Sequence, residues 1–175
     1  MRDKQDQTPL QLLMADHWFK GPLDDYINVI RLFLEHGGDI DSTSSTDSTM
    51  LHVAVEKASL EVVHLLLDCG ANINARDENG QTPLHRAMYN IRDDMEDHFF
   101  AILLFLDHGA DVDALDNSHS TPLSMASYFG SIKATRLLLE YGASTHLQNV
   151  AGQTPLEVAL MAGHEEVTQL LLEHL

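Results

Sequence analysis

The feature that most constrains the fold of this chain is a repeat of 33 residues. Five threonines, four of them followed by Pro-Leu, lie 41, 33, 39 and 33 residues apart, at Thr8, Thr49, Thr82, Thr121 and Thr154. A second marker, at Gly37, Gly70, Gly109 and Gly142, keeps the steps of 33, 39 and 33. Both markers therefore belong to one unit with two interruptions. Self-similarity at this period indicates supersecondary units that bury their apolar sides by stacking on one another.

Each unit contains the signals of two helices. The threonine is a good N-cap, and proline at the next position has a suitable φ and no N–H to satisfy. At Thr154 the spacing to Glu157 also fits a capping box. About ten residues later the pattern turns, at Ala58, Gly130 or Gly163, and an aliphatic helix follows. The marker glycines then predict left-handed C-caps.

The segment after each second helix is polar and rich in turn-forming residues, which predicts an extended hairpin finger. The serine-rich tract 42–48 holds register with residues 75–81, so we interpret it as a finger and not as a linker. Asp47 and His119 replace the glycines found at Gly80 and Gly152. If those positions keep a positive φ, each carries about 1–2 kcal/mol of local strain.

These units resemble ankyrin repeats. The family pattern is matched by Asp77, Gly80, the run from Thr82 to His85, and the run from Gly109 to Asp113. The resemblance implies an all-α repeat solenoid of stacked helix-turn-helix units with β-hairpin-like fingers. It also implies that His52 and His85 support their turns by hydrogen bonding. The chain would be one domain, 1–175, with five repeats at about 3–43, 44–76, 77–115, 116–148 and 149–175.

Alignment of the repeats places two insertions, 18–25 and 92–97, between the helices of repeats one and three. A longer turn explains both, because lengthening a surface loop costs little closure entropy. The charges of 92–97 suit a solvated face. Trp18 leaves two interpretations open: it anchors an interface, as exposed aromatics often do, or it packs onto the flank of repeat two.

Composition restricts the partners. The net charge of −17, with ten basic residues in 175, argues against nucleic acid and is compatible with a partner that has a basic surface. No apolar run is long enough to span a membrane. Cys69 is the single cysteine, so no internal disulfide can form. We expect a cytoplasmic monomer; the alternative is an exported protein whose signal peptide was removed before this numbering begins.

No catalytic motif is present in the sequence: it has no phosphate-binding glycine loop, no Gly-x-Ser-x-Gly and no His-Glu-x-x-His. Several of the eleven histidines repeat at one position of the unit, as His36, His108 and His174 do, which indicates a structural column and not a metal site. We therefore expect a non-enzymatic protein without cofactor or metal.

In ankyrin proteins the concave face of fingers and inner helices binds partner proteins. Of the matching positions, we expect Tyr89, Tyr128, Phe129 and Met161 to contribute most, because aromatics and methionine dominate interface anchoring. Burial between inner helices is the alternative for Phe129 and Met161. The full set is Arg76, Glu78, Asn79, Gln81, Met88 and Tyr89, then Leu115, Asn117, Ser118, Ser120, Ser127, Tyr128 and Phe129, then Gln148, Val150, Ala151, Gln153, Leu160 and Met161, together with Trp18.

Two functions remain open at this point. The chain is an adaptor or scaffold that holds a protein partner, or it is a dedicated inhibitor or immunity-type protein that covers a partner's active site or docking surface. The lack of a recognisable second domain in the sequence favours the blocker slightly, since an adaptor usually brings two proteins together.

Overall fold

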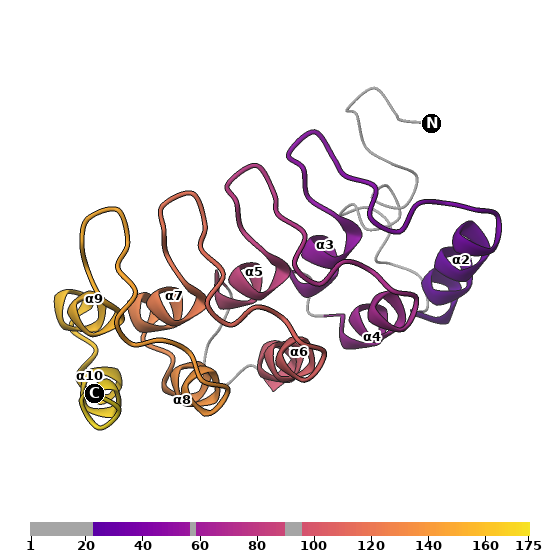
Figure 1. Ribbon diagram of the computed structural model, residues 1–175. Helices are drawn as coiled ribbons and strands as arrows, with labels where there is room; N and C mark the ends of the chain where they lie inside the picture. Colours follow the sequence, from indigo (N-terminus) through magenta and orange to yellow (C-terminus); the bar gives the residue numbers. More distant parts are fainter. Residues whose placement is uncertain (1–22, 57–58, 90–95) are drawn as a thin grey trace.

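The computed structural model describes residues 23–56, 59–89 and 96–175. They form a row of helical hairpins with projecting fingers (Figure 1). The helices are α2 (Leu23–Glu35), α3 (Met50–Glu56), α4 (Leu60–Asp68), α5 (Pro83–Tyr89), α6 (Glu96–Asp107), α7 (Pro122–Phe129), α8 (Ile132–Glu140), α9 (Pro155–Ala162) and α10 (Glu165–Leu172).

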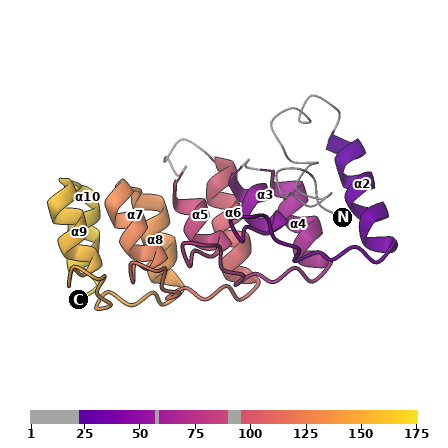
Figure 2. The same ribbon diagram turned by 90° about the horizontal axis from the view of Figure 1, so that it is seen from above.

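The helices are arranged in two layers. Helices α3, α5, α7 and α9 form an inner layer beside the fingers, and α2, α4, α6, α8 and α10 form an outer layer (Figure 1). Within each layer a helix packs on its neighbour, as α5 does on α7 and α6 on α8. Seen from above, the fingers line one end of the helices (Figure 2). This arrangement is the expected all-α solenoid.

The predicted helix boundaries are confirmed where the structure describes them. Thr121 and Thr154 are N-caps whose hydroxyl oxygens accept hydrogen bonds from the third helical N–H, and Thr154 and Glu157 form the capping box. The inner helices α7 and α9 end at glycines in the left-handed conformation. The outer-helix glycines also have positive φ angles, from 79° to 84°, at Gly37, Gly70, Gly109 and Gly142.

The core lies between the two layers and runs the length of the row. Its largest fully buried members include Ile30, Leu66, Phe105 and Leu138, from successive outer helices. Inner helices contribute residues such as Leu84 and Leu123, which are also buried. Because the apolar side of each hairpin is covered by its neighbours, stability depends on stacking.

The fingers are held by hydrogen bonds within and between repeats. In the third finger, Asp77 N–H donates to Gln81 O at 2.9 Å, and the serine-rich tract is a finger of the same kind, in which Ser44 N–H donates to Ser48 O. Each of the three later fingers also donates a backbone N–H to a carbonyl oxygen of the previous finger, such as Asn117 N–H to Asn79 O at 2.9 Å. The described residues contain no assigned strand, so the fingers are hairpin-like.

The two insertions are partly helical, which corrects the expectation of purely longer turns. Residues 23–25 open α2 and residues 96–97 open α6, so both outer helices are longer than α4, α8 and α10. Trp18 and residues 92–95 lie outside the described residues, and the two interpretations of Trp18 stay open.

Candidate protein-binding surface

The fingers project beside the inner helices along the whole row (Figure 1), so that fingers and inner helices together form one face. We call this face, made by residues 76–81, 115–120 and 148–153 with the finger side of α5, α7 and α9, the concave surface. Large apolar side chains project from it into solvent: Tyr128 is 62% exposed, Val150 68% and Met161 74%. Such a grouping of exposed apolar residues on one face is a common mark of an interaction site.

An aromatic cluster lies at the ends of α5 and α7. The ring centroids of Tyr89 and Phe129 are 5.7 Å apart, and those of Tyr128 and Phe129 are 5.2 Å apart. Phe129 is half-buried between the two tyrosines, which are both exposed. These rings join repeats three and four and present a rigid apolar wall to solvent.

A glutamine before the N-cap threonine braces the concave surface in two repeats. Gln81 Nε2 donates to the Tyr89 hydroxyl at 2.7 Å, and Gln153 Nε2 lies 2.7 Å from Met161 Sδ at the matching positions. In repeat four the glutamine is replaced by Ser120, whose side chain is shorter. Tyr128 therefore has no such brace.

A finger carboxylate is paired with an arginine in repeat three but not in repeat four. Asp77 Oδ1 accepts from two finger N–H groups, while Asp77 Oδ2 accepts from Arg86 Nε and Nη2 at 2.9 and 2.7 Å. Asp116 Oδ1 accepts the matching pair of N–H groups, both at 2.8 Å. The residue that matches Arg86 is Met125, and within the described residues Asp116 Oδ2 accepts no hydrogen bond.

These two replacements coincide with a hollow in the concave surface of about 360 Å³. We call it the repeat-four pocket. Two long polar side chains that repeat three carries, Gln81 and Arg86, are replaced there by Ser120 and Met125. The lining consists of Tyr89, Asp116, Ser118, Ser120, Ser124, Met125, Tyr128, Phe129, Asn149, Gln153 and Val158.

Two buried histidines tie successive repeats together beneath the fingers. His52 Nδ1 accepts from Thr49 N–H at 3.2 Å, and His52 Nε2 donates to Gln81 O of the next repeat at 3.0 Å. His85 makes the same bonds with Thr82 and with Ser120 O. Burial lowers the pKa of both imidazoles below the ordinary value of 6.5. The turn-supporting role expected for them is confirmed.

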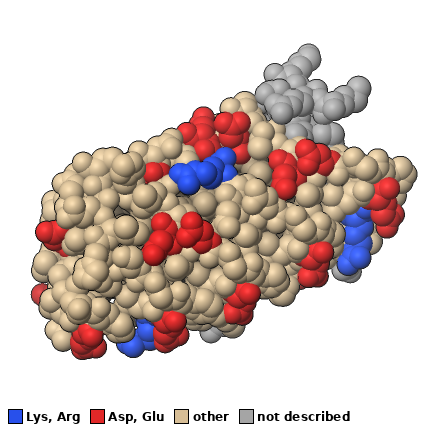
Figure 3. Space-filling view, viewed as in Figure 1, with Lys and Arg blue, Asp and Glu red and all other residues tan. Residues whose placement is uncertain are grey.

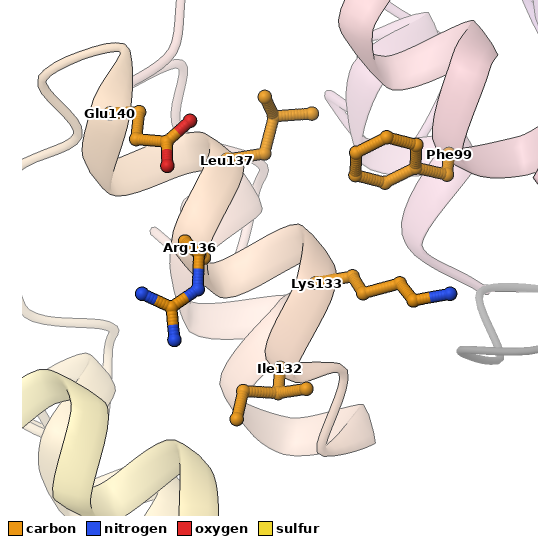
Figure 4. Close-up of a pocket in the computed structure, with 6 residues that line it drawn as sticks. All are labelled: Phe99, Ile132, Lys133, Arg136, Leu137 and Glu140. Atoms are coloured by element: carbon orange, nitrogen blue, oxygen red, sulfur yellow. The ribbon is translucent and has the colours of Figure 1, made fainter.

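A second hollow, of about 220 Å³, lies on the outer layer between α6 and α8 (Figure 4). Its walls are partly aliphatic and partly aromatic, and its two basic side chains extend in different directions: Lys133 toward the side of the hollow on which Phe99 lies, and Arg136 away from that side. The cations therefore do not converge on one point. This hollow offers no grouping of functional side chains comparable to that in the repeat-four pocket.

Comparison with known families agrees with the geometry. A family model for ankyrin repeats in three copies matches residues 2–77, 20–114 and 95–175, which together span almost the whole chain. The chain belongs to the ankyrin repeat family. Ankyrin repeats generally mediate protein–protein interaction, and proteins of this family are typically non-enzymatic.

Three relatives illustrate the range of proteins that share these ankyrin repeats. Protein phosphatase 1 regulatory subunit 27 of Mus musculus is 31% identical over 102 residues, 58% of this chain and 64% of the relative. B-cell lymphoma 3 protein homolog of Mus musculus is 47% identical over 60 residues, 33% and 13% of the two chains. The Neurogenic locus Notch protein of Drosophila melanogaster is 38% identical over 66 residues, 37% and 2%. In each case the match spans less than two thirds of the relative's length.

The structure places most predicted contact residues on the ankyrin concave surface, with three corrections. Met88 and Ser127 are fully buried, on helices α5 and α7 that each pack against the next inner helix. Gln81 is only 5% exposed, and its side chain is hydrogen-bonded to Tyr89. They support the surface from below. The residues that remain at least partly exposed are Arg76, Glu78, Asn79, Tyr89, Leu115, Asn117, Ser118, Ser120, Tyr128, Phe129, Gln148, Val150, Ala151, Gln153, Leu160 and Met161.

Some of these residues also stabilise the ankyrin stack. The Arg76 guanidinium donates to the carbonyl oxygen of Leu115 in the next repeat, and Asn117 Nδ2 donates to Glu78 O at 3.0 Å. Leu160, 58% exposed, occupies the position that Met88 fills in repeat three, so it is exposed only because its repeat is the last one described.

Sequence reasoning missed several lining residues of the repeat-four pocket, above all Asp116 and Met125. The alignment contained the signal, since Asp116 matches Asp77 and Met125 matches Arg86. The alignment does not show that Arg86 and Asp77 form an ion pair, which is seen only in the three-dimensional structure.

In the described residues no helix is long and apolar enough to cross a membrane.

Proposed function

We propose that this chain binds a protein partner through its concave surface and has no catalytic activity of its own. The observation that carries the proposal is the group of exposed aromatic and aliphatic side chains at Tyr89, Tyr128, Val150 and Met161. Tyr89 and Met161 are held by glutamine side chains, and the fingers are hydrogen-bonded to one another, so less conformational entropy is lost when a partner covers this surface.

The charge distribution supports a partner with a basic surface. Acidic side chains are spread over the face of the molecule seen in Figure 3, with few lysine and arginine side chains among them. A net charge of −17 would attract a basic partner and raise the association rate at low ionic strength. We expect the chain to act as a monomer, since the stack itself supplies the binding face.

The experiment compares two tyrosine-to-alanine variants. Tyr128 is on the concave surface, whereas Tyr141, 38% exposed, ends the outer helix α8. A protein captured by the wild-type chain is purified, and its affinity is measured by calorimetry. We expect Tyr128→Ala to weaken binding by about tenfold or more, the range of an interface hot spot, and Tyr141→Ala to leave it unchanged. Equal affinities for both variants would place the interface elsewhere.

A second candidate function is that the partner is an enzyme and that binding inhibits it. The observation that favours it is the similarity to one relative, a regulatory subunit of a phosphatase, which aligns with 58% of this chain. An adaptor leaves its saturated partner active, whereas an inhibitor does not. Assaying the captured partner at saturating concentrations of this chain separates the two functions.

A further inference from the structure

We propose that the repeat-four pocket binds an arginine side chain of the protein partner, with Asp116 as the counter-ion. The inference rests on the proposed function, because it assumes a protein seated on the concave surface. It specifies one contact within that interface: a guanidinium group of the partner enters the pocket beside the Tyr89 ring and donates hydrogen bonds to Asp116 Oδ2.

Repeat three provides the internal precedent. There the Arg86 guanidinium lies against Asp77 Oδ2 at 2.7 Å and approaches Glu56 Oε1 of the preceding repeat at 3.6 Å. The side chain of Asp77 is fully buried, and the positive charge of Arg86 compensates its negative charge. In repeat three the carboxylate at this position of the unit is therefore paired with a guanidinium through two charge-assisted hydrogen bonds.

Repeat four keeps the carboxylate and loses the cation. Asp116 is only 9% exposed and lines the pocket, but the residue that matches Arg86 is the uncharged Met125. In the described residues no basic side chain forms an ion pair with Asp116, and the Arg76 guanidinium donates to the carbonyl oxygen of the adjacent Leu115. A largely buried carboxylate without an ion-pair partner is costly, and the cost falls when a cation from outside supplies that partner. An apolar side chain in the pocket would instead remove the remaining water from Asp116 and leave its charge uncompensated.

The walls of the pocket favour arginine over lysine. The residue that matches Glu56 is Tyr89, and its ring lies 5.7 Å from that of Phe129. A planar guanidinium stacks on such rings and is more weakly hydrated than an ammonium group, so it loses less on entering an aromatic pocket. Met125 and Val158 add apolar surface for the methylene groups of the arginine stem.

The probes are four capped tripeptides, glycine-X-glycine, with arginine, citrulline, lysine or leucine at X. Citrulline has the shape of arginine without its charge. Binding is followed by nuclear magnetic resonance on the ¹⁵N-labelled chain, through the amides of Ser118 and Ser120 that donate to Asp116 Oδ1. We expect saturable shifts with the arginine peptide at a Kd on the order of 1 mM, and at least about tenfold weaker binding of the other three.

Two variants change the pocket in opposite ways. Asp116→Asn removes the charge and keeps the finger, because Asn149 at the same position in repeat five accepts the same two N–H bonds, both at 3.0 Å. Met125→Arg supplies the internal cation that Arg86 supplies in repeat three. We expect each variant to bind the arginine peptide about tenfold or more weakly than the wild-type chain does. Glu140→Gln, an equal change of charge on α8, is the control and should have no effect.

The outcomes separate this inference from the proposed function. Equal binding of the arginine and leucine peptides, a lysine peptide that binds as tightly as arginine, or an unchanged affinity in Asp116→Asn would overturn the arginine pocket. Suppose that Tyr128→Ala loses affinity for the protein partner, whereas Asp116→Asn and Met125→Arg bind it as the wild type does. The proposed binding through the concave surface is then supported, and the proposed arginine contact is wrong. If Met125→Arg does not fold, Asp116→Asn still decides the question.

Discussion

His119 provides a direct test of the repeat geometry, because it holds a backbone conformation that favours glycine. Its φ is +56°, and the matching residues in the neighbouring fingers are Gly80 and Gly152, with φ of +71° and +75°. The His119 side chain is exposed and makes no hydrogen bond within the described residues. Replacing His119 with glycine should therefore remove strain without removing a contact.

The expected size of the effect follows from two opposing terms. Relief of the left-handed strain gains about 1–2 kcal/mol, and the greater freedom of glycine in the unfolded chain takes back about 0.4–1 kcal/mol. With the middle value of each range, the free energy of unfolding should rise by roughly 0.8 kcal/mol. For a chain of this length that is a rise in Tm of ~1–4 °C.

The assay is urea unfolding and thermal melting of two histidine-to-glycine variants. His146 is also exposed, and it is not among the described residues with positive φ, so His146→Gly should lower the free energy of unfolding by about 0.4–1 kcal/mol. The reasoning is refuted if His119→Gly destabilises the chain as much as His146→Gly does.

Three further predictions follow from other contacts. Stability should fall as pH drops below about 6.5, because burial lowers the pKa of His52 and His85; the neutral rings stabilise the fold fully above the unfolded-state value, and this stabilisation is lost on acidification. Urea midpoints at pH 7.5 and 5.5 test this, and a His85→Gln variant should show a smaller difference between them. Thr154→Ala removes the N-cap of α9 and should cost about 1 kcal/mol in the same assay, with Thr168→Ala as a half-buried control. Association with a basic partner should slow as salt rises past the point where the Debye length is ~10 Å; stopped-flow rates independent of salt would contradict electrostatic steering.

Local chemistry explains why so much of the fold could be predicted from sequence. An N-cap such as Thr154 with Glu157, and a positive-φ position such as Gly142, depend on neighbours within a few residues. When such signals recur in phase every 33 residues, each repeat supports the interpretation of the others. The helix order, the fingers and the turn-supporting histidines follow from this phase.

The candidate surface was only partly predictable, because exposure depends on neighbouring helices. Met88 and Leu160 occupy the same position in their repeats, but Met88 is fully buried and Leu160 is 58% exposed. The sequence alone gives the same prediction for both residues, a place on the concave side. Only the stack decides which of them another helix covers.

The sequence by itself determined the repeat unit, its caps and the positions at which a concave surface would form, since these depend on short-range geometry. Tertiary structure alone decided how charge is compensated on that surface. Arg86 meets Asp77 across nine residues, while Asp116 lines the same pocket as Met125 and, in the part of the chain that the structure describes, accepts only finger N–H groups. Pairing between side chains depends on where packing brings them, and no periodic pattern carries that information.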